Sequence, residues 1–393
     1  MESQSTSYQK SYPPKYIIPI VIIICIFFGY INKKVIWTSM NTESSEELST
    51  ESYDIGVYYY PWYFNDFHGG QYLRRHLVPP QEPNLGQYND RDESIIKQHL
   101  SWSRYAGINL WVTSWWGPGS REDVTILNSI LQHPDLGDFK IALFYETEGR
   151  TSSFTDYSSL GTDITYLTEH YFGHPNYMKI DGKPVLFIYL TRVLSARGTL
   201  QKSLDTIRNA ASDANFSLYI VGDYVFGSPP NVPGDISLLD GVTNYDVYGS
   251  MDATGYATQT KVDLYFANQA SWKLLADSAD VAFIPAVTPG FNDRAVRDGH
   301  APLSRKLDNN QEFGSLFRVM IQKAKNLTDS SIDRLIMVTS WNEWHEDTQI
   351  EPVKPAPTTN LDDSKTGDAY TDKLSYESYG ERYLQILREE IIH

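Results

Sequence analysis

The sequence of 393 residues predicts an α/β protein, a (β/α)8 (TIM) barrel behind an N-terminal transmembrane anchor. Two observations predict the barrel. Eight short runs rich in β-branched and aromatic residues recur along the chain, and helical patterns fall between most of them. A third observation, an uncharged apolar run near the N-terminus, predicts the anchor.

The apolar run covers residues 17–31 and reads IIPIVIIICIFFGYI. It is shorter than the roughly 20 residues that span a bilayer, but residues 35–37 extend it if the intervening lysines snorkel. We therefore expect a cytoplasmic tail at 1–16 and an uncleaved transmembrane signal anchor at 17–37. A cleaved signal peptide is the alternative, although no convincing small-x-small cleavage site follows the run.

Residues 38–52, TSMNTESSEELSTES, are polar and acidic and have no apolar periodicity, which is typical of a flexible stem. The folded domain then occupies 53–393. Lysines flank both ends of the anchor, so the short N-terminal tail is the reason to expect a type II topology with a lumenal domain. Sequons at Asn215 and Asn326 fit this topology, although such tripeptides also arise by chance. The single cysteine, Cys25, lies in the anchor and excludes an intrachain disulfide.

The candidate strands of the folded domain are bounded by turn residues and are short enough for a barrel. They cover 55–60, 108–114, 140–145, 184–189, 217–221, 241–245, 281–287 and 335–340. Apolar residues at helical spacing predict helices over 93–105, 124–131, 200–211, 264–276, 313–324 and 376–391. The Pro/Gly-rich stretch 222–234 shows no helical pattern.

Composition excludes one class of partner. The formal net charge is -16, from 49 acidic and 33 basic residues, and there is no long Lys/Arg cluster, so we expect no nucleic-acid binding. The chain is also rich in aromatic residues, with 28 Tyr and 9 Trp. Their rings stack on sugar faces in carbohydrate sites, although most individual rings pack in protein cores.

Glu343 and Glu346 are the candidate catalytic residues. A glycosidase needs two carboxyl groups, one that donates a proton and one that assists attack at the anomeric carbon. Both glutamates follow the eighth predicted strand, and barrels place their active sites at the C-terminal ends of strands. In a helical turn, their i, i+3 spacing puts the Cβ atoms roughly 5–6 Å apart, which is compatible with a retaining enzyme.

Three aromatic neighbours, Trp341, Trp344 and His345, interleave with these acids. Apolar surroundings raise the pKa of a carboxyl group, as a general acid requires at neutral pH. Two other interpretations are a solvated glutamate pair on a loop and a metal site that includes His345. No second histidine stands nearby at ligand spacing, so we expect neither a metal nor a cofactor.

The segment SWNEWHEDTQIEP at 340–352 resembles the NEWHEGTQIE signature of glycoside hydrolase family 99, the endo-α-1,2-mannosidases. Other segments resemble the family in the same order: YYYPWY at 58–63, LGQYNDRD at 85–92, TSWWGPGS at 113–120 and PGFNDRAVR at 289–297. The resemblance runs from about Tyr53 to the C-terminus. It implies a (β/α)8 glycoside hydrolase domain, a mannose-containing glycan substrate and, with the anchor, a Golgi location.

The resemblance also implies a retaining route through a 1,2-anhydro sugar, with Glu343 as the base and Glu346 as the acid/base. Two positions depart from the signature: Trp341 stands where phenylalanine is usual, and Asp347 stands where glycine is usual. Asp347 adds a charge beside the acids, which affects the expected substrate preference more than the expected reaction.

Substrate contacts are expected from other strand ends. The resemblance implies that these residues are Tyr60, Trp62, His76, Trp116, Glu146, Tyr245, Arg297, Asn342 and Trp344. Each of them has packing in the core or in a loop as its structural alternative, and the sequence does not decide whether Trp115 or Trp116 points inward. Two other functions stay open: sugar transfer on the same barrel, and a catalytically silent glycan-binding barrel.

Overall fold

The computed structural model describes residues 52–392, apart from 148–149, 151–157, 252–254 and 298. The predicted tail and anchor lie outside the described residues, as does the predicted stem except for its last residue. Within the described part of the chain, no helix combines the length and the apolar character needed to cross a membrane. The fold described below is that of the compact unit that begins at Thr50.

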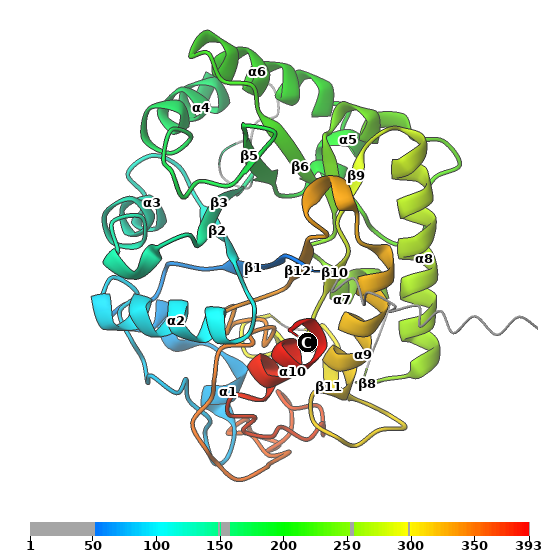
Figure 1. Cartoon of the computed structure of the whole chain (residues 1–393). Helices are drawn as coiled ribbons and strands as arrows, with labels where there is room; N and C mark the ends of the chain where they lie inside the picture. The colour runs from blue at the N-terminus through cyan, green and yellow to red at the C-terminus, as the bar shows by residue number, and fades with distance from the viewer. Residues whose placement is uncertain (1–51, 148–149, 151–157, 252–254, 298, 393) are drawn as a thin grey trace, which may run out of the picture. The chain divides into compact units, whose positions relative to one another are not determined.

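Parallel strands form a closed ring at the centre of this unit (Figure 1). In order around the ring they are β1 (Ile55–Tyr59), β2 (Leu110–Trp115), β3 (Lys140–Tyr145), β5 (Lys183–Ile188), β6 (Tyr219–Asp223), β7 (Gly241–Thr243), β9 (Ala282–Phe283) with β10 (Ala286–Val287), and β12 (Ile336–Val338). β9 pairs with β7 and β10 pairs with β12, so these two consecutive pieces share one position. β1 pairs with both β12 and β2, which closes the ring. The predicted (β/α)8 barrel is confirmed.

The strands form where the sequence is apolar on both faces. All six residues of β2, LWVTSW, are buried, as are all five of β1. Parallel strands covered on both faces have this near-continuous apolar character, and β-branched and aromatic side chains suit their pleated surface. Each of the eight predicted strand segments overlaps an observed strand position, so this part of the prediction is confirmed.

Helices surround the ring (Figure 1). They are α2 (Glu93–Tyr105), α3 (Arg121–Thr125), α4 (Ser158–His170), α6 (Leu200–Asp213), α8 (Gln259–Ser278), α9 (Ser315–Ala324) and α10 (Arg382–Ile391), together with the short α1 (Leu73–His76), α5 (Thr191–Ala196) and α7 (Val247–Met251). α2 has the predicted bounds. The helix predicted at 124–131 is instead the end of α3 followed by a π-helical turn at Ile126–Ile130.

The structure also differs from the helix predictions at α10 and at α4. α10 begins at Arg382 instead of 376, because Tyr376 pairs with Thr359 in an antiparallel bridge. α4 was not predicted, since its sequence SSLGTDITYLTEH holds a glycine and several Ser and Thr residues of low helix propensity. α4 packs against α6, and this tertiary contact stabilises it. As expected, 222–234 contains no α-helix; a 3-10 helix begins at its last residue and covers Gly234–Leu238.

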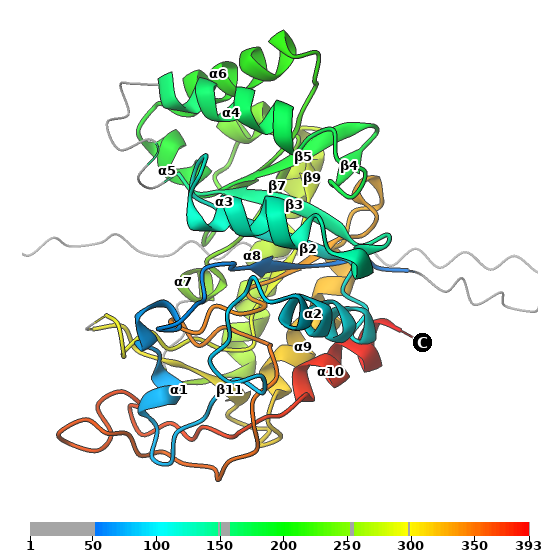
Figure 2. The same ribbon diagram turned by 90° about the vertical axis from the view of Figure 1, so that its left-hand side faces the viewer.

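Segments outside the ring complete the end of the barrel to which the strands point. In Figure 2 the arrow of β1 points to the side where α7 and the loop between β10 and β11 lie. β11 (Leu303–Leu307) pairs in parallel with β8 (Gly255–Ala257) in a separate two-stranded sheet, and β4 (Lys179–Ile180) pairs with β5. The segments that follow the strands at this end carry the candidate site.

Candidate active site

The segment 339–351 directly follows β12 and folds back on itself. The backbone N–H of Ser340 donates to the carbonyl of Thr348 at 2.9 Å, and the N–H of Ile350 donates to the carbonyl of Ser340 at 3.0 Å. Between these bonds, residues 344–347 form a turn and not a helix. The condition attached to the spacing of the two glutamates, a helix in this segment, is therefore not met, because the segment closes into a loop through its own hydrogen bonds.

Asn342 joins this loop to the end of β1. Its Oδ1 accepts from the backbone N–H of Tyr60 at 2.8 Å, and its Nδ2 donates to the carbonyl of Tyr60 at 3.0 Å. The hydroxyl of Tyr63 donates to the carbonyl of Asn342 at 2.6 Å. Asn342 is fully buried, so its amide holds two segments together and does not face a substrate.

Glu343 is buried and is held by His345. Its Oε1 accepts from the backbone N–H of His345 at 2.8 Å and lies 2.9 Å from the ring Nδ1. Burial alone would lower the pKa of His345, but the adjacent Glu343 carboxylate outweighs it and the pKa is raised. The ring Nε2 lies 3.2 Å from the carbonyl of His68, so both ring nitrogens face acceptors, as protonated histidine requires. The ring of Trp62 stacks on the ring of His68 and contacts the ring of His345 edge-on, so it packs beside both histidines.

Glu346 has a different environment. Its Oε1 accepts from Nη1 of Arg297 at 2.8 Å, and its side chain is 19% exposed. Burial, followed by the charge of Glu343, raises the pKa of Glu346 to about 7, while Arg297 acts in the opposite direction. Nη1 of Arg297 also donates to Oδ2 of the buried Asp293 at 3.0 Å, and Nδ1 of His300 lies 2.7 Å from the same oxygen.

Two tyrosine hydroxyls lie beside the glutamates. Tyr60, at the end of β1, and Tyr245, after β7, share a hydrogen bond between their hydroxyl groups. Burial, followed by the charges of Glu146 and Glu343, raises the pKa of Tyr60 well above its usual value. Both hydroxyls therefore keep their protons at neutral pH and remain able to donate hydrogen bonds.

Glu346 lies at the wall of a cavity of about 420 Å³. This volume is in the range of small-ligand sites. Arg297 and Tyr245 also line it. The other lining residues are Tyr189, Asp246, Val247, Tyr248, Gly249, Thr288, Phe291, His300, Thr339 and Thr348.

The structure decides between the two tryptophans that follow β2. Trp115 is fully buried, and its indole N–H donates to Asp123 at 2.8 Å. Trp116 is 36% exposed, and its indole N–H donates to Oγ of Ser114 at 2.9 Å. The Ser114 hydroxyl in turn donates to Oε1 of Glu146 at 2.7 Å. Trp116 is thus the ring of the pair that is available to a ligand, and Ser114 connects it to Glu146.

Besides Asn342, two more of the residues expected to bind substrate have other contacts. His76, on α1, lies 3.0 Å from Asp363 through its Nδ1, and its ring meets Tyr370. Trp344 is 1% exposed, and its indole N–H donates to Oε2 of the buried Glu351 at 2.8 Å. The Trp344 side chain therefore packs in the core and does not face the cavity.

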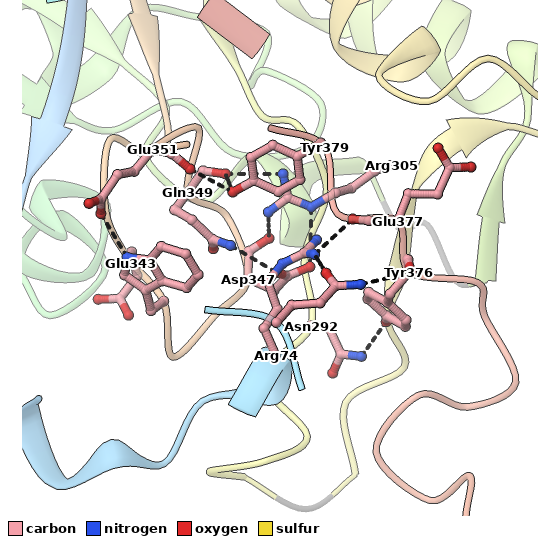
Figure 3. Close-up of polar contacts among 12 residues, drawn as sticks. Arg74, Asn292, Arg305, Glu343, Asp347, Gln349, Glu351, Tyr376, Glu377 and Tyr379 are labelled. Atoms are coloured by element: carbon pink, nitrogen blue, oxygen red, sulfur yellow. Dashed lines mark hydrogen bonds and ion pairs between the residues drawn. The ribbon is translucent and has the colours of Figure 1, made fainter. Parts of the chain in front are cut away.

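Asp347 is not a free charge beside the acids. It is buried, and its carboxylate lies between the guanidinium groups of Arg74 and Arg305 (Figure 3). In Figure 3, Glu343 lies apart from this group on the same loop. The additional charge that was expected beside the acids is therefore paired with two arginines that lie far away in the sequence, so it does not stand free next to Glu343 and Glu346.

Sequence reasoning missed several residues of the cavity. Asp246 and Tyr248 follow β7, and Tyr189 follows β5, so their position after barrel strands was an available signal. Asp293 does not line the cavity but binds Arg297, and it lies inside the segment PGFNDRAVR, which was already identified. Among the described residues, no group of three or more His, Cys, Asp and Glu side chains is arranged to hold a metal ion.

Comparisons with known proteins agree with this geometry. The sequence profile of glycosyl hydrolase family 99 matches residues 77–384. The glycoprotein endo-alpha-1,2-mannosidase of Mus musculus is 26% identical, with 80% of this chain and 71% of that protein covered. The protein of the same name from Xenopus laevis is 25% identical, with 80% and 73% covered.

Two solved structures share the fold. The family 99 endo-alpha-mannosidase of Bacteroides thetaiotaomicron, in complex with bis-tris propane, has a TM-score of 0.57 at 23% identity, covering 86% of this chain and 95% of that one. A glycoside hydrolase-like protein has a TM-score of 0.59 at 18% identity, covering 87% and 94%. The profile match extends over most of the chain and includes the loop that carries both glutamates. This chain is therefore a glycoside hydrolase and belongs to glycosyl hydrolase family 99.

Proposed function

We propose that this chain is a retaining, endo-acting α-mannosidase that hydrolyses an internal α-1,2-mannosidic bond in glycans. The observation that carries the proposal is a pair of glutamates after the last barrel strand with different partners: Glu343 against His345, and Glu346 against Arg297 at the cavity. Two carboxyl groups in contrasting environments suit the two tasks of a glycosidase. The choice of mannose rests on the names of the relatives.

In the proposed reaction, Glu343 is the base. Its carboxylate takes the proton of the sugar 2-hydroxyl, whose oxygen attacks the anomeric carbon and forms a 1,2-anhydro sugar. The two hydrogen bonds from His345 orient this carboxylate. A hydroxyl is a weak nucleophile unless its proton is removed as attack proceeds, so the position of the base determines the rate.

Glu346 is the proposed acid/base. With a pKa of about 7, it is protonated in a substantial fraction of molecules near neutral pH. It gives this proton to the departing oxygen as the glycosidic bond breaks. It then takes a proton from the water that opens the anhydro ring, while Glu343 returns its proton to the 2-oxygen. Two inversions at the anomeric carbon retain the configuration.

We assign the substrate contacts by exposure and position. The hydroxyls of Tyr60 and Tyr245, the ring of Trp62, and the group formed by Trp116 and Glu146 lie at the ends of barrel strands. Arg297 contacts Glu346 directly. Asn342 and Trp344 are buried, so we assign them the task of holding the loop. His76 contacts Asp363 and Tyr370, so it acts on the substrate only if a long glycan extends to α1.

The test is hydrolysis of high-mannose glycans, glucosylated and unglucosylated, by the soluble domain. We expect a released oligosaccharide whose first-formed anomer is α by NMR, with no covalent sugar adduct. An initial β anomer contradicts the retaining route. Glycan binding without product after long incubation supports a silent binding barrel, and transfer of the sugar to an added acceptor in preference to water supports a transferase.

The roles of the two acids are tested with two leaving groups. Glu346→Gln should lose most activity on a glycan, whose departing oxygen needs a proton, and keep much of its first-step rate on an activated aryl mannoside. Glu343→Gln should lose roughly 100-fold to 10,000-fold on both substrates. If the leaving-group dependence appears in Glu343→Gln instead, the two roles are reversed.

We propose that the chain is a single-pass type II membrane protein of the Golgi with a lumenal catalytic domain. The apolar run at 17–31 supports the anchor. The sequon residues Asn215 and Asn326 are both exposed on the folded domain, so neither needs unfolding to carry a glycan.

A further inference from the structure

Asp347 occupies an unusual backbone position directly after Glu346. Its φ is 48°, in the left-handed region, where Asp, Asn and Gly are the residues most often found. Its carbonyl and side chain are both bound, and the residue is 1% exposed. The backbone at this point turns sharply, so Glu346 and Asp347 direct their carboxylates to different partners, Arg297 and a pair of buried arginines.

Both oxygens of the Asp347 carboxylate are occupied. Oδ1 accepts from Nε of Arg74 at 2.6 Å and from Nε2 of Gln349 at 3.1 Å. Oδ2 accepts from Nε of Arg305 at 3.2 Å. Burial would raise the pKa of Asp347, but Arg305 and then Arg74 outweigh it and lower the pKa. The carboxylate is therefore ionised at neutral pH.

Arg305, on β11, also holds the backbone of the loop. Its Nη2 donates to the carbonyl of Asp347 at 2.7 Å, and its Nη1 donates to the carbonyl of Gln349 at 3.0 Å. One guanidinium group thus makes three bonds to two residues that follow Glu346, using the planar fork that only arginine offers. These bonds are seen in Figure 3.

Arg74, on α1, is fixed in turn by residues outside the loop. Its Nη1 donates to the side chain of Gln81 and to the carbonyl of Glu377 at 3.1 Å. The ring of Tyr379 lies 4.8 Å from the guanidinium carbon of Arg74 and 5.0 Å from that of Arg305, so it contacts both cations. The three ionised groups are almost completely buried, so this cluster has a geometry that the surrounding fold determines.

The backbone at Glu346 is therefore fixed by two sets of contacts. Its carbonyl accepts from the backbone N–H of Asn292 at 2.7 Å, and the next residue is bound to Arg74 and Arg305. The segment is otherwise a turn without helical support. A displacement of about 1 Å of a reacting group can lower a rate on the order of 100-fold, so the anchoring of this turn bears directly on proton transfer.

We propose that Asp347 is a positioning residue: its carboxylate, clamped between Arg74 and Arg305, fixes the turn that directs Glu346 at the departing oxygen. The assignment of proton transfer to Glu346 rests on the proposed function. The proposal that Asp347 fixes the turn is independent of that function. Asp347 touches no substrate, and its contribution to the reaction passes through the orientation of Glu346.

The test variant is Asp347→Asn, which keeps the side-chain shape and tolerates a positive φ but removes the charge. We expect the amides of 340–351 to exchange with solvent roughly tenfold faster, as measured by mass spectrometry at a temperature where circular dichroism shows the variant folded. On a glycan, kcat should fall on the order of 100-fold with KM changed by less than about threefold, while the first-step rate on an activated aryl mannoside, measured as release of the aryl group, should fall by less than about threefold.

The matched control is Asp280→Asn. Asp280 has a φ of 56° and is exposed after α8, at the end of the barrel opposite the glutamates, so its substitution should leave exchange and both rates unchanged. A second variant, Arg305→Lys, keeps the charge but loses the fork. Arg305→Lys should change amide exchange and kcat in the same direction as Asp347→Asn. If Asp347→Asn does not fold, Arg305→Lys is measured in its place.

Unchanged exchange in 340–351 overturns the proposal, and so does an equal loss on the two substrates, which is the pattern of a purely structural role. If the wild type turns over neither substrate, the proposed function fails. The exchange measurement then decides alone whether Asp347 clamps the turn.

Discussion

Glu343 and Glu346 are chemically the same residue, three positions apart, and their neighbours make them different. Glu343 accepts hydrogen bonds from His345, whose pKa is raised. Glu346 faces the cavity beside Arg297, and burial together with the charge of Glu343 raises its pKa to about 7. This contrast leads to two predictions at the scale of single residues.

The first concerns the pH dependence of activity. If Glu346 donates a proton, kcat/KM on a glycan should fall as the pH rises through about 7, because the group then ionises. Arg297→Gln removes a cation that lowers this pKa, so the midpoint of the fall should move upward by about one pH unit. Arg208→Gln, which changes an arginine paired with Asp240, should leave the midpoint in place. A midpoint that moves downward in Arg297→Gln contradicts the assignment.

The second concerns stability. Folding raises the pKa of Glu346, so protonated Glu346 contributes to the stability of the folded state. This contribution is fully present below about pH 4.5, the ordinary pKa, and is lost as the pH rises through about 7. Glu346→Gln cannot ionise. Its stability relative to wild type should therefore increase between pH 5 and pH 8 by about 2–3 kcal/mol, measured by urea unfolding. Glu169→Gln, at a side chain that is 65% exposed, is the control. A pH-independent difference would show that folding does not disfavour the charge of Glu346.

At the scale of elements, the first and last strands of the barrel are joined beyond their own ladder. β1 and β12 pair in parallel, and past their ends the N–H of Trp341 donates to the carbonyl of Tyr58 at 2.8 Å. Asn342 then bonds both backbone groups of Tyr60. These contacts transmit the position of β1 to the loop that carries the glutamates.

Asn342→Ala should therefore destabilise the domain. The substitution leaves the buried N–H and carbonyl of Tyr60 without these partners, at a cost of about 2–4 kcal/mol in the free energy of unfolding. The measurement is urea unfolding in the variant and in Asn326→Ala, whose exposed amide makes a single 3.3 Å bond to Gln322 and should cost less than about 0.5 kcal/mol. A cost below about 1 kcal/mol in Asn342→Ala would contradict the clamp.

At the scale of the whole molecule, the folded domain carries its site at the end of the barrel to which the strands point, and its sequons lie elsewhere. Asn215 follows α6, before β6, and Asn326 lies in a 3-10 turn after α9, before β12. Both positions precede strands, so they lie toward the opposite end of the barrel. Neither residue lines the cavity, so a glycan on either would be attached away from it.

The full chain, expressed in eukaryotic cells, should resist extraction by alkaline carbonate and carry two N-glycans. Asn215→Gln and Asn326→Gln should each remove one glycan, observed as one step in gel mobility before enzymatic deglycosylation and none after it. Recovery in the soluble fraction with a new N-terminus near Ser39 would instead indicate a cleaved signal peptide. An anchored but unglycosylated chain would contradict the lumenal topology.

The sequence by itself determined the eight strand positions of the barrel and the place of the two glutamates after the last strand. Apolar, β-branched runs such as 108–114 become strands because their composition suits a sheet buried on both faces, and Glu343 and Glu346 are placed at a strand end by their order along the chain. The helix at 93–105 was predicted with its observed bounds because its periodicity is local information.

The partners of those side chains were decided only by the tertiary structure. Asp347 reads as an additional charge in the sequence, yet closure of the barrel brings Arg74 and Arg305 to it from 273 and 42 residues away. Trp115 and Trp116 are adjacent and identical, and the tertiary structure buries the ring of Trp115 against α3, β3 and α4. The spacing of apolar residues within a segment predicts its secondary structure. The pairing of charges and the exposure of aromatic rings depend instead on which segments lie side by side in the closed barrel.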